Sequence, residues 1–190
     1  MKRILFTVML AFAALHVCSA QFAVTVLGEA APLASFPKAG AGGRVSLGWD
    51  LKYSYLEFGA GARYSLEEVT AVPSEGEEAA TAGYDRMRYY ATAAFYLRAL
   101  GNESHSLNAY LGGGAFAGTQ GYASRAGDAE GTDGAPKGGV VYGVYPSIQL
   151  EAFITRNLAL VATGCWEFGL GDEKGKGIPF AGIGVRYLMD

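Results

Sequence analysis

The stretch RMRYYATAAFYLR, residues 86–98, decides the fold. Its side chains alternate along the chain. One face holds Met87, Tyr89, Ala91, Ala93, Phe95 and Leu97, and the other holds Arg86, Arg88, Tyr90, Thr92, Tyr96 and Arg98. Successive side chains of a β-strand point to opposite faces of the sheet. The stretch therefore predicts a strand with one apolar face and one polar face.

The same alternation recurs along the chain. We expect eight strands, near residues 22–29, 40–50, 54–67, 84–98, 106–119, 139–153, 157–169 and 178–188. Each run is close to the ~9–11 residues that a tilted strand needs to cross a bilayer. Pro146 lies within the sixth run, where its missing N–H predicts a bulge or a weak point.

Composition excludes several classes of protein. Of 190 residues, 51% are hydrophobic, 13% are aromatic and only 17% are charged, which excludes intrinsic disorder. The net charge is −3 and no cluster of lysine and arginine stands out, so we predict no direct nucleic-acid binding. The length suits one domain.

Residues 1–20 have the pattern of a cleaved signal peptide. Lys2 and Arg3 precede an apolar run at residues 4–15, and Cys18-Ser19-Ala20 puts small residues at the cleavage site. The apolar run is short for a membrane anchor. Val17 is too bulky for a lipidation site at Cys18. We therefore expect a β-barrel domain over residues 21–190, with no spanning helix.

Two barrels fit this pattern, one soluble and one in a membrane. A membrane barrel turns its apolar face to lipid, and a soluble periplasmic ligand-binding barrel turns it inward. Aromatic residues near the predicted strand ends favour the membrane, namely Trp49, Tyr64, Trp166, Phe168 and Tyr187. Short connections near 51–53, 99–105 and 154–156 alternate with long ones near 30–39, 68–83, 120–138 and 170–177. We predict an all-β, eight-stranded antiparallel up-and-down barrel of the outer-membrane type, with both termini in the periplasm.

In that orientation the polar face brings charges of both signs into the lumen. They are Arg44, Glu57, Arg63, Arg88, Glu151, Glu167 and Arg186. An eight-stranded barrel is only wide enough inside for side chains. We expect a salt-bridged network that plugs the lumen, with Cys165 packed beside it. A selective channel is the alternative, although a selectivity ring carries charges of one sign.

No residue pattern predicts catalysis, so we expect no enzyme, no cofactor, no metal and no small-molecule substrate. His105 lies between two serines at a predicted turn, where a solvated side chain is favoured over a catalytic one. The acidic loops do not have the EF-hand spacing, and a solvated loop is favoured over a Ca²⁺ site. Loops on a rigid scaffold often carry function. The candidate interaction residues are Glu75, Glu77, Glu78, Tyr122 and Arg125.

Two segments resemble a known family. They are YYATAAFYLRALGNESHSLNAYLGGGAFAGTQGY, residues 89–122, and VVYGVYPSIQLEAFITRNLALVATGCWEFGLGDEKGKGIPFAGIGVRYLMD, residues 140–190. Both are similar to the TraO family of conjugative transposons from Bacteroides-type bacteria. The shared features include a tyrosine-rich strand, the run Leu-Gly-x-Gly-Ala-x-Ala-Gly-x-x-x-Tyr and the closing Gly-Ile-Gly-Val-Arg-Tyr.

The resemblance implies an exported envelope component of a conjugal DNA transfer apparatus, with no enzymatic residues. Its implied partners are outer-membrane lipid and other proteins of the apparatus. Three other functions stay open at this point. They are a general small outer-membrane barrel (an adhesin, a stabiliser or a narrow pore), an outer-membrane enzyme centred on His105, and the soluble ligand-binding barrel.

Overall fold

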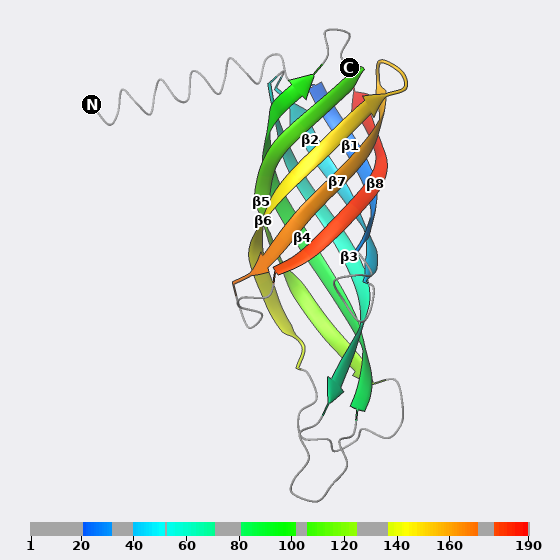
Figure 1. Cartoon of the computed structure of the whole chain (residues 1–190), viewed down its shortest axis with the longest axis vertical. Helices are drawn as coiled ribbons and strands as arrows, with labels where there is room; N and C mark the ends of the chain where they lie inside the picture. The colour runs from blue at the N-terminus through cyan, green and yellow to red at the C-terminus, as the bar shows by residue number, and fades with distance from the viewer. Residues whose placement is uncertain are drawn as a thin grey trace, which may run out of the picture.

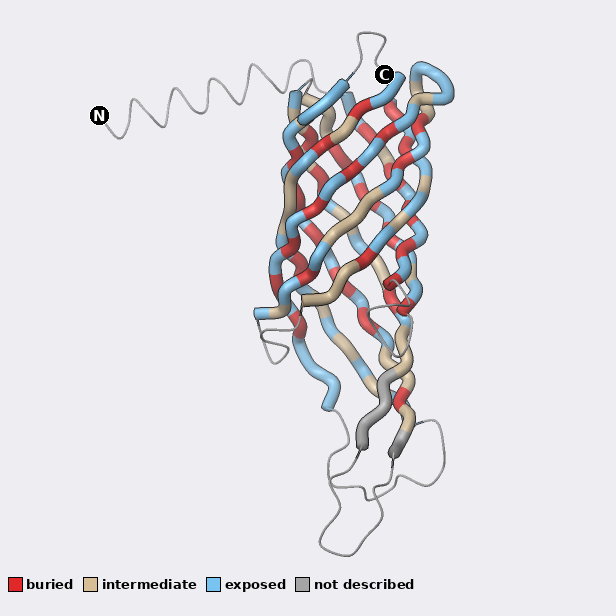
Figure 2. Tube along the Cα trace, in the orientation of Figure 1, coloured by how far each residue is buried: buried red, intermediate tan, exposed pale blue. Residues whose placement is uncertain are grey.

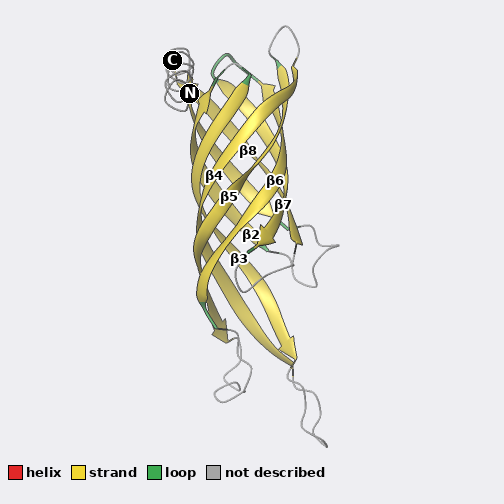
Figure 3. Cartoon of the chain, turned by 90° about the vertical axis from the view of Figure 1, so that its left-hand side faces the viewer, coloured by secondary structure: helices red, strands yellow, loops and turns green. Residues whose placement is uncertain are grey.

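The computed structural model describes residues 21–31, 40–51, 53–70, 81–101, 106–124, 137–170 and 177–189. The predicted signal peptide and most of the long connections lie outside these residues. Within them the chain is built from β-strands joined by short turns (Figure 3). No helix in these ranges is long and apolar enough to cross a membrane.

Eight strands form one closed barrel. They are β1 (Gln21–Ala30), β2 (Ala41–Asp50), β3 (Ser54–Thr70), β4 (Thr81–Gly101), β5 (Leu107–Ser124), β6 (Gly139–Phe153), β7 (Leu158–Gly169) and β8 (Gly177–Met189). Each strand pairs antiparallel with its neighbour in sequence, and β1 pairs with β8 to close the barrel (Figure 1). The predicted up-and-down barrel is confirmed.

The two ends of the barrel differ. The start of β1, the end of β8 and the short turn at residues 154–157 lie at one end, which we call the turn end (Figure 1). At the opposite end, the loop end, β3, β4 and β5 extend beyond the other strands. β3 continues six residues past Tyr64, which is its last partner for β2. The sequence predicted these extended strands to be shorter.

One candidate interaction residue therefore needs correction. Tyr122 was expected in a loop, but it lies in β5, where its backbone pairs with that of Arg86 in β4. The pairing continues because β4 and β5 form a ribbon that projects past the rim of the barrel. Glu75, Glu77, Glu78 and Arg125 lie outside the described residues.

Pro146 does not shift the register of β6. The pairing of β5 with β6 runs through it without interruption, with Gly113 opposite Pro146. On the other side, the pairing of β6 with β7 is broken between Val144 and Ser147 but resumes in the same register. The expected bulge is wrong, and the weak point is a local gap in one ladder, because proline has no N–H to donate. A register shift occurs instead in β4, between Arg98 and Leu100.

The apolar face of each strand points outward. Buried and exposed residues alternate along the strands (Figure 2), and large apolar side chains such as Phe58, Phe95, Leu150 and Leu160 are each at least 45% exposed. The inward face is buried and carries charged, polar and aromatic side chains. A soluble barrel requires the opposite arrangement, since water would meet the outer face. The chain is a small eight-stranded barrel of the outer-membrane type.

Candidate functional site

The polar lumen is the candidate functional site. The structure places all seven predicted lumen charges inside the barrel, and none is more than 6% exposed. They come from six of the eight strands: Arg44 from β2, Glu57 and Arg63 from β3, Arg88 from β4, Glu151 from β6, Glu167 from β7 and Arg186 from β8. Inward positions alternate with outward ones in every strand, so barrel closure alone brings these residues together.

At the loop end, Arg63 joins two carboxylates. Its Nε donates to Glu29 Oε2 at 2.9 Å, and its Nη1 donates to Glu167 Oε1 at 2.5 Å. Arg88 Nη1 lies 3.6 Å from the other oxygen of Glu167, and Arg88 Nη2 donates to Gln120 Oε1 at 3.2 Å. Each carboxylate here is therefore shared between structural elements that are distant in the sequence.

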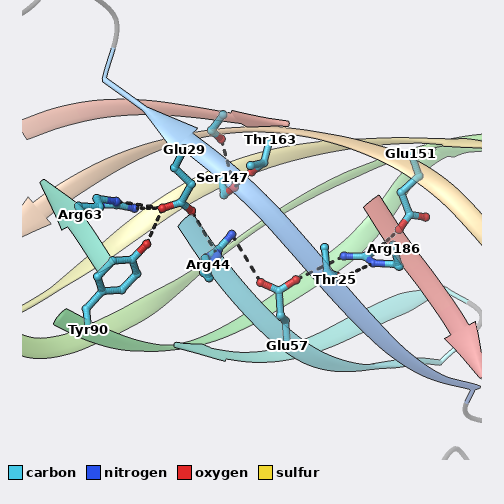
Figure 4. Close-up of polar contacts among 11 residues, drawn as sticks. Thr25, Glu29, Arg44, Glu57, Arg63, Tyr90, Ser147, Glu151, Thr163 and Arg186 are labelled. Carbon is cyan, nitrogen blue, oxygen red and sulfur yellow. Dashed lines mark hydrogen bonds and ion pairs between the residues drawn. The ribbon is translucent and has the colours of Figure 1, made fainter. Parts of the chain in front are cut away.

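At the turn end, Arg186 is the central cation. It forms an ion pair with Glu151, and its Nη2 lies 3.3 Å from Glu57 Oε2. Its Nε donates to Thr25 Oγ1 at 2.9 Å. Arg44 connects the two ends, because it lies 3.3 Å from Glu29 and 3.6 Å from Glu57 (Figure 4).

These ion pairs form one continuous chain of alternating charge. In order it runs Glu151, Arg186, Glu57, Arg44, Glu29, Arg63, Glu167 and Arg88, which we call the lumen network. It holds four arginines and four glutamates, so its formal charges sum to zero. A buried charge is costly unless it is paired, and this network gives each charge at least one partner of opposite sign.

Aromatic rings pack against the guanidinium groups. Arg186 Cζ lies 3.8 Å from the ring centroid of Tyr55, and Arg63 Cζ lies 3.8 Å from that of Phe180. Tyr90 also donates its hydroxyl to Glu29 at 2.5 Å (Figure 4). Rings and ions together fill the lumen, and each ring fixes the plane of the arginine that it contacts.

The sequence interpretation missed Glu29. This residue accepts from both Arg63 and Tyr90 and lies 3.3 Å from Arg44, so it links three strands to β1. The spacing in the sequence could have identified it. Glu29 and Thr25 are four residues apart in one strand, so they share a face, and Thr25 is also buried. Leu27 lies between them on the same inward face, and an apolar residue there hid the alternation.

The remaining candidates divide between the lumen and the undescribed residues. Cys165 is a free thiol in β7 that packs, partly buried, against the aromatic core at the side of the lumen. His105 lies outside the described residues. Within the described ranges, no group of three or more histidine, cysteine, aspartate or glutamate residues is placed to hold a metal ion.

No family model and no curated protein matches the chain. Solved structures with a similar arrangement include the N-terminal β-barrel domain of OprF from Pseudomonas aeruginosa, at 16% identity and a TM-score of 0.45 over 90% of this chain and 100% of that chain. Ail, the attachment invasion locus protein of Yersinia pestis, is 13% identical with a TM-score of 0.48, over 90% of this chain and 97% of that chain. Neisserial surface protein A is 14% identical with a TM-score of 0.45, over 88% and 96%. The strand pairings of this chain, and not these likenesses, establish its fold.

Proposed function

We propose that the protein is a non-conducting barrel of the outer membrane that works through its two ends. The observation that carries this proposal is the lumen network, in which four arginines and four glutamates neutralise one another inside a closed ring of strands. A pore needs a wet path with groups that release the ion again. A lumen filled with paired charges and rings serves instead as a rigid support.

Membrane location is tested by fractionation. We expect the protein to stay with the outer-membrane fraction after washing with high salt and to enter solution only with detergent, because its outer face is apolar. Recovery of the folded protein from the periplasm without detergent would contradict the proposal and favour the soluble barrel.

We further propose that this support belongs to a conjugal DNA transfer apparatus, as an interaction component and not as an enzyme. The support for this step is the resemblance of residues 89–122 and 140–190 to the TraO family. In this proposal, the partners are other proteins of the apparatus, and contact is made by the loops or the turns. Lipid surrounds the strands.

The test is deletion of the gene followed by a mating assay. We expect transfer of the element to be lost, with growth and detergent resistance of the cells unchanged, and to return when the gene is supplied in trans. Complementation of the deletion strain with a His105→Ala variant tests the enzymatic alternative. If His105 were catalytic, this variant would not restore transfer. Normal transfer in the deletion strain would reject the conjugal role and leave a general outer-membrane barrel.

A further inference from the structure

The strands β7 and β8 form a small unit of the barrel wall at the loop end. It consists of residues 166–169 and 177–180, and we call it the β7–β8 tip. The two strands pair with each other within the tip. A Cβ at Gly177 would meet the rings of both Trp166 and Phe168, so these side chains pack closely over the glycine. The tip is therefore held together from within.

The hydrogen-bond pattern between β6 and β7 decides how Pro146 affects the attachment of the tip. At the loop end, Leu170 N donates to Tyr142 O. At the turn end, Ile154 N donates to Leu158 O. Hydrogen-bonded positions alternate along an antiparallel pair, so the even-numbered residues of β6 are the ones that bond to β7. Pro146 is at an even position, and its missing N–H is therefore one that would face β7.

The break in the ladder lies at the base of the tip. The register places Pro146 opposite Trp166, and the pairing of β6 with β7 is interrupted there. Beyond the break, β6 pairs with the tip through residues 143–144. Toward the turn end, the ladder resumes at Ser147, whose hydroxyl also donates to Gly164 O at 3.1 Å. The tip is therefore attached to β6 by a short segment of ladder.

On its other side, the tip extends past β1. The pairing of β1 with β8 ends at Ala30 and Ala181, so within the described residues the β8 part of the tip pairs with β7 alone. Ile178 and Phe180 of the tip line a hollow at this end of the lumen. Along the described residues, neither flank of the tip is therefore held by a continuous ladder.

Two side chains of the tip fasten it to the lumen network. Glu167 lies 2.5 Å from Nη1 of Arg63 in β3 and 3.6 Å from Nη1 of Arg88 in β4. Phe180 stacks on Arg63, whose Cζ lies 3.8 Å from the centroid of the ring. Strands β3 and β4 are on the opposite side of the closed barrel from β7 and β8. These contacts therefore cross the lumen and resist an outward tilt of the tip.

We propose that the β7–β8 tip is a flap that tilts outward as one unit, with its base at the row of Pro146 and with Glu167 as its latch. When Glu167 leaves its partners, Arg63 and Arg88 are uncovered at the loop end. The turn half of the lumen network, centred on Arg186, is built from residues outside the tip and stays closed. The flap therefore controls access to the loop end of the lumen without opening a channel through the barrel.

The experiment measures amide hydrogen exchange by NMR on the folded protein in phosphatidylcholine nanodiscs. A segment that opens as a unit gives all its amides the same protection, whereas fraying gives protection that rises residue by residue from the end of the strand. We expect one common protection factor for the tip amides of both strands. It should be at least about tenfold lower than that of β7 and β8 nearer the turn end.

One pair of variants tests the latch. Glu167→Gln removes the charge that holds the tip, and we expect the protection of the tip amides to fall about tenfold or more, at residues 177–180 as well as in β7. Glu151→Gln is the matched control, because it removes a carboxylate that is also buried and paired with an arginine, at the other end of the lumen network. It should leave the protection of the tip amides unchanged.

A second pair of variants tests the base of the flap. Pro146→Ala supplies the missing N–H toward Trp166, and we expect the protection of the tip amides to rise in both strands. Pro179→Ala is the matched control, because Pro179 lies opposite Trp166 on the other side. Leu188 N donates to Asn157 O, so the even-numbered residues of β8 bond to β7 and Pro179 does not. This control should leave the tip unchanged.

Each variant is first checked for the gel shift of a folded barrel, and the proline pair decides the question if Glu167→Gln does not fold. Graded protection along the tip would overturn the proposal. Equal effects of Glu167→Gln and Glu151→Gln on the tip amides would also overturn it, as would a Pro146→Ala variant with unchanged exchange at residues 177–180. None of these outcomes depends on a role in DNA transfer, so a failure here leaves the conjugal proposal standing, and the reverse also holds.

Discussion

Glu57 joins Arg44 to Arg186 in the lumen network. It is completely buried and lies between two cations, 3.6 Å from Arg44 and 3.3 Å from Arg186. A buried ion pair adds little net stability over an apolar replacement, yet removal of one partner leaves an uncompensated charge. The network is therefore detected by the loss in free energy of unfolding when one of its charges is removed.

We expect Glu57→Gln to lower the free energy of unfolding by about 3–5 kcal/mol, because Arg44 and Arg186 would each lose one of their two carboxylate partners and the closed lumen would hold one positive charge in excess. Urea unfolding of the barrel in lipid vesicles measures this. The matched control is Asp85→Asn, which removes a partly exposed carboxylate that accepts from Tyr64 and should cost no more than about 1 kcal/mol. Equal losses in the two variants would mean that burial of the network adds nothing.

Glycine is required where rings fill the lumen. A Cβ at Gly48 would collide with the ring of Tyr55, which itself supports Arg186. We expect Gly48→Ala to destabilise the barrel by about 1–3 kcal/mol, since overpacking forces side chains off their rotamers. Gly139→Ala is the control, because nothing lies within 4 Å of a Cβ there, and its effect should be within about 0.5 kcal/mol. The same unfolding assay compares the two, and a neutral Gly48→Ala would show that Tyr55 can move freely.

Some lumen residues could be predicted from the sequence and others could not. Arg88 and Glu151 were assigned to the lumen because strict alternation fixed their faces. Glu29 was missed because inward Leu27 disturbed the pattern in β1. The pairing partners of the lumen charges were also beyond prediction, since strand tilt and stagger, which are properties of the closed barrel, decide which side chains meet.

At the scale of a strand, the outer face of β4 should respond to charge according to depth. Ala93 is exposed on the lipid side near the middle of the strand. Ala99 is exposed at the turn end, at the register shift. We expect Ala93→Arg to cost about 2–4 kcal/mol in a bilayer and Ala99→Arg about 0–1 kcal/mol.

Unfolding in vesicles gives both values, and unfolding in detergent micelles serves as a second condition. The difference between the two variants should shrink in micelles, where water reaches the outer face more readily. Equal costs at the two positions in vesicles would contradict a bilayer centred on the strands.

The ends of β3, β4 and β5 were predicted too short for a physical reason. Alternation arises only where one face of a strand meets lipid and the other meets the lumen. The segment Glu68-Val69-Thr70 continues β3 past the predicted end at residue 67 by pairing with β4, and its sequence no longer alternates. Backbone pairing between the strands continues after the alternation of apolar and polar residues has ended. Hydropathy therefore indicates the width of the membrane zone and not the length of the strand.

At the scale of the whole molecule, the filled lumen predicts that the barrel does not conduct ions. We expect the purified protein in a planar bilayer to carry no steady ion current at physiological salt, because paired charges and aromatic rings occupy the interior. A general porin in the same bilayer is the positive control. Steady stepwise current through the barrel would contradict the plugged lumen and support the narrow-pore alternative.

The pairing of β1 with β8 has a consequence for biogenesis. The partners in this seam, such as Phe22 and Met189, come from opposite ends of the strand series, so the seam forms only after the last strand has been synthesised. Contacts so distant along the chain make folding slow. Until then both terminal strands expose unsatisfied backbone groups that would pair with other chains. A polypeptide with this topology therefore needs chaperones that prevent its aggregation before the barrel closes. A truncated copy that lacks either terminal strand would be a target for proteolysis.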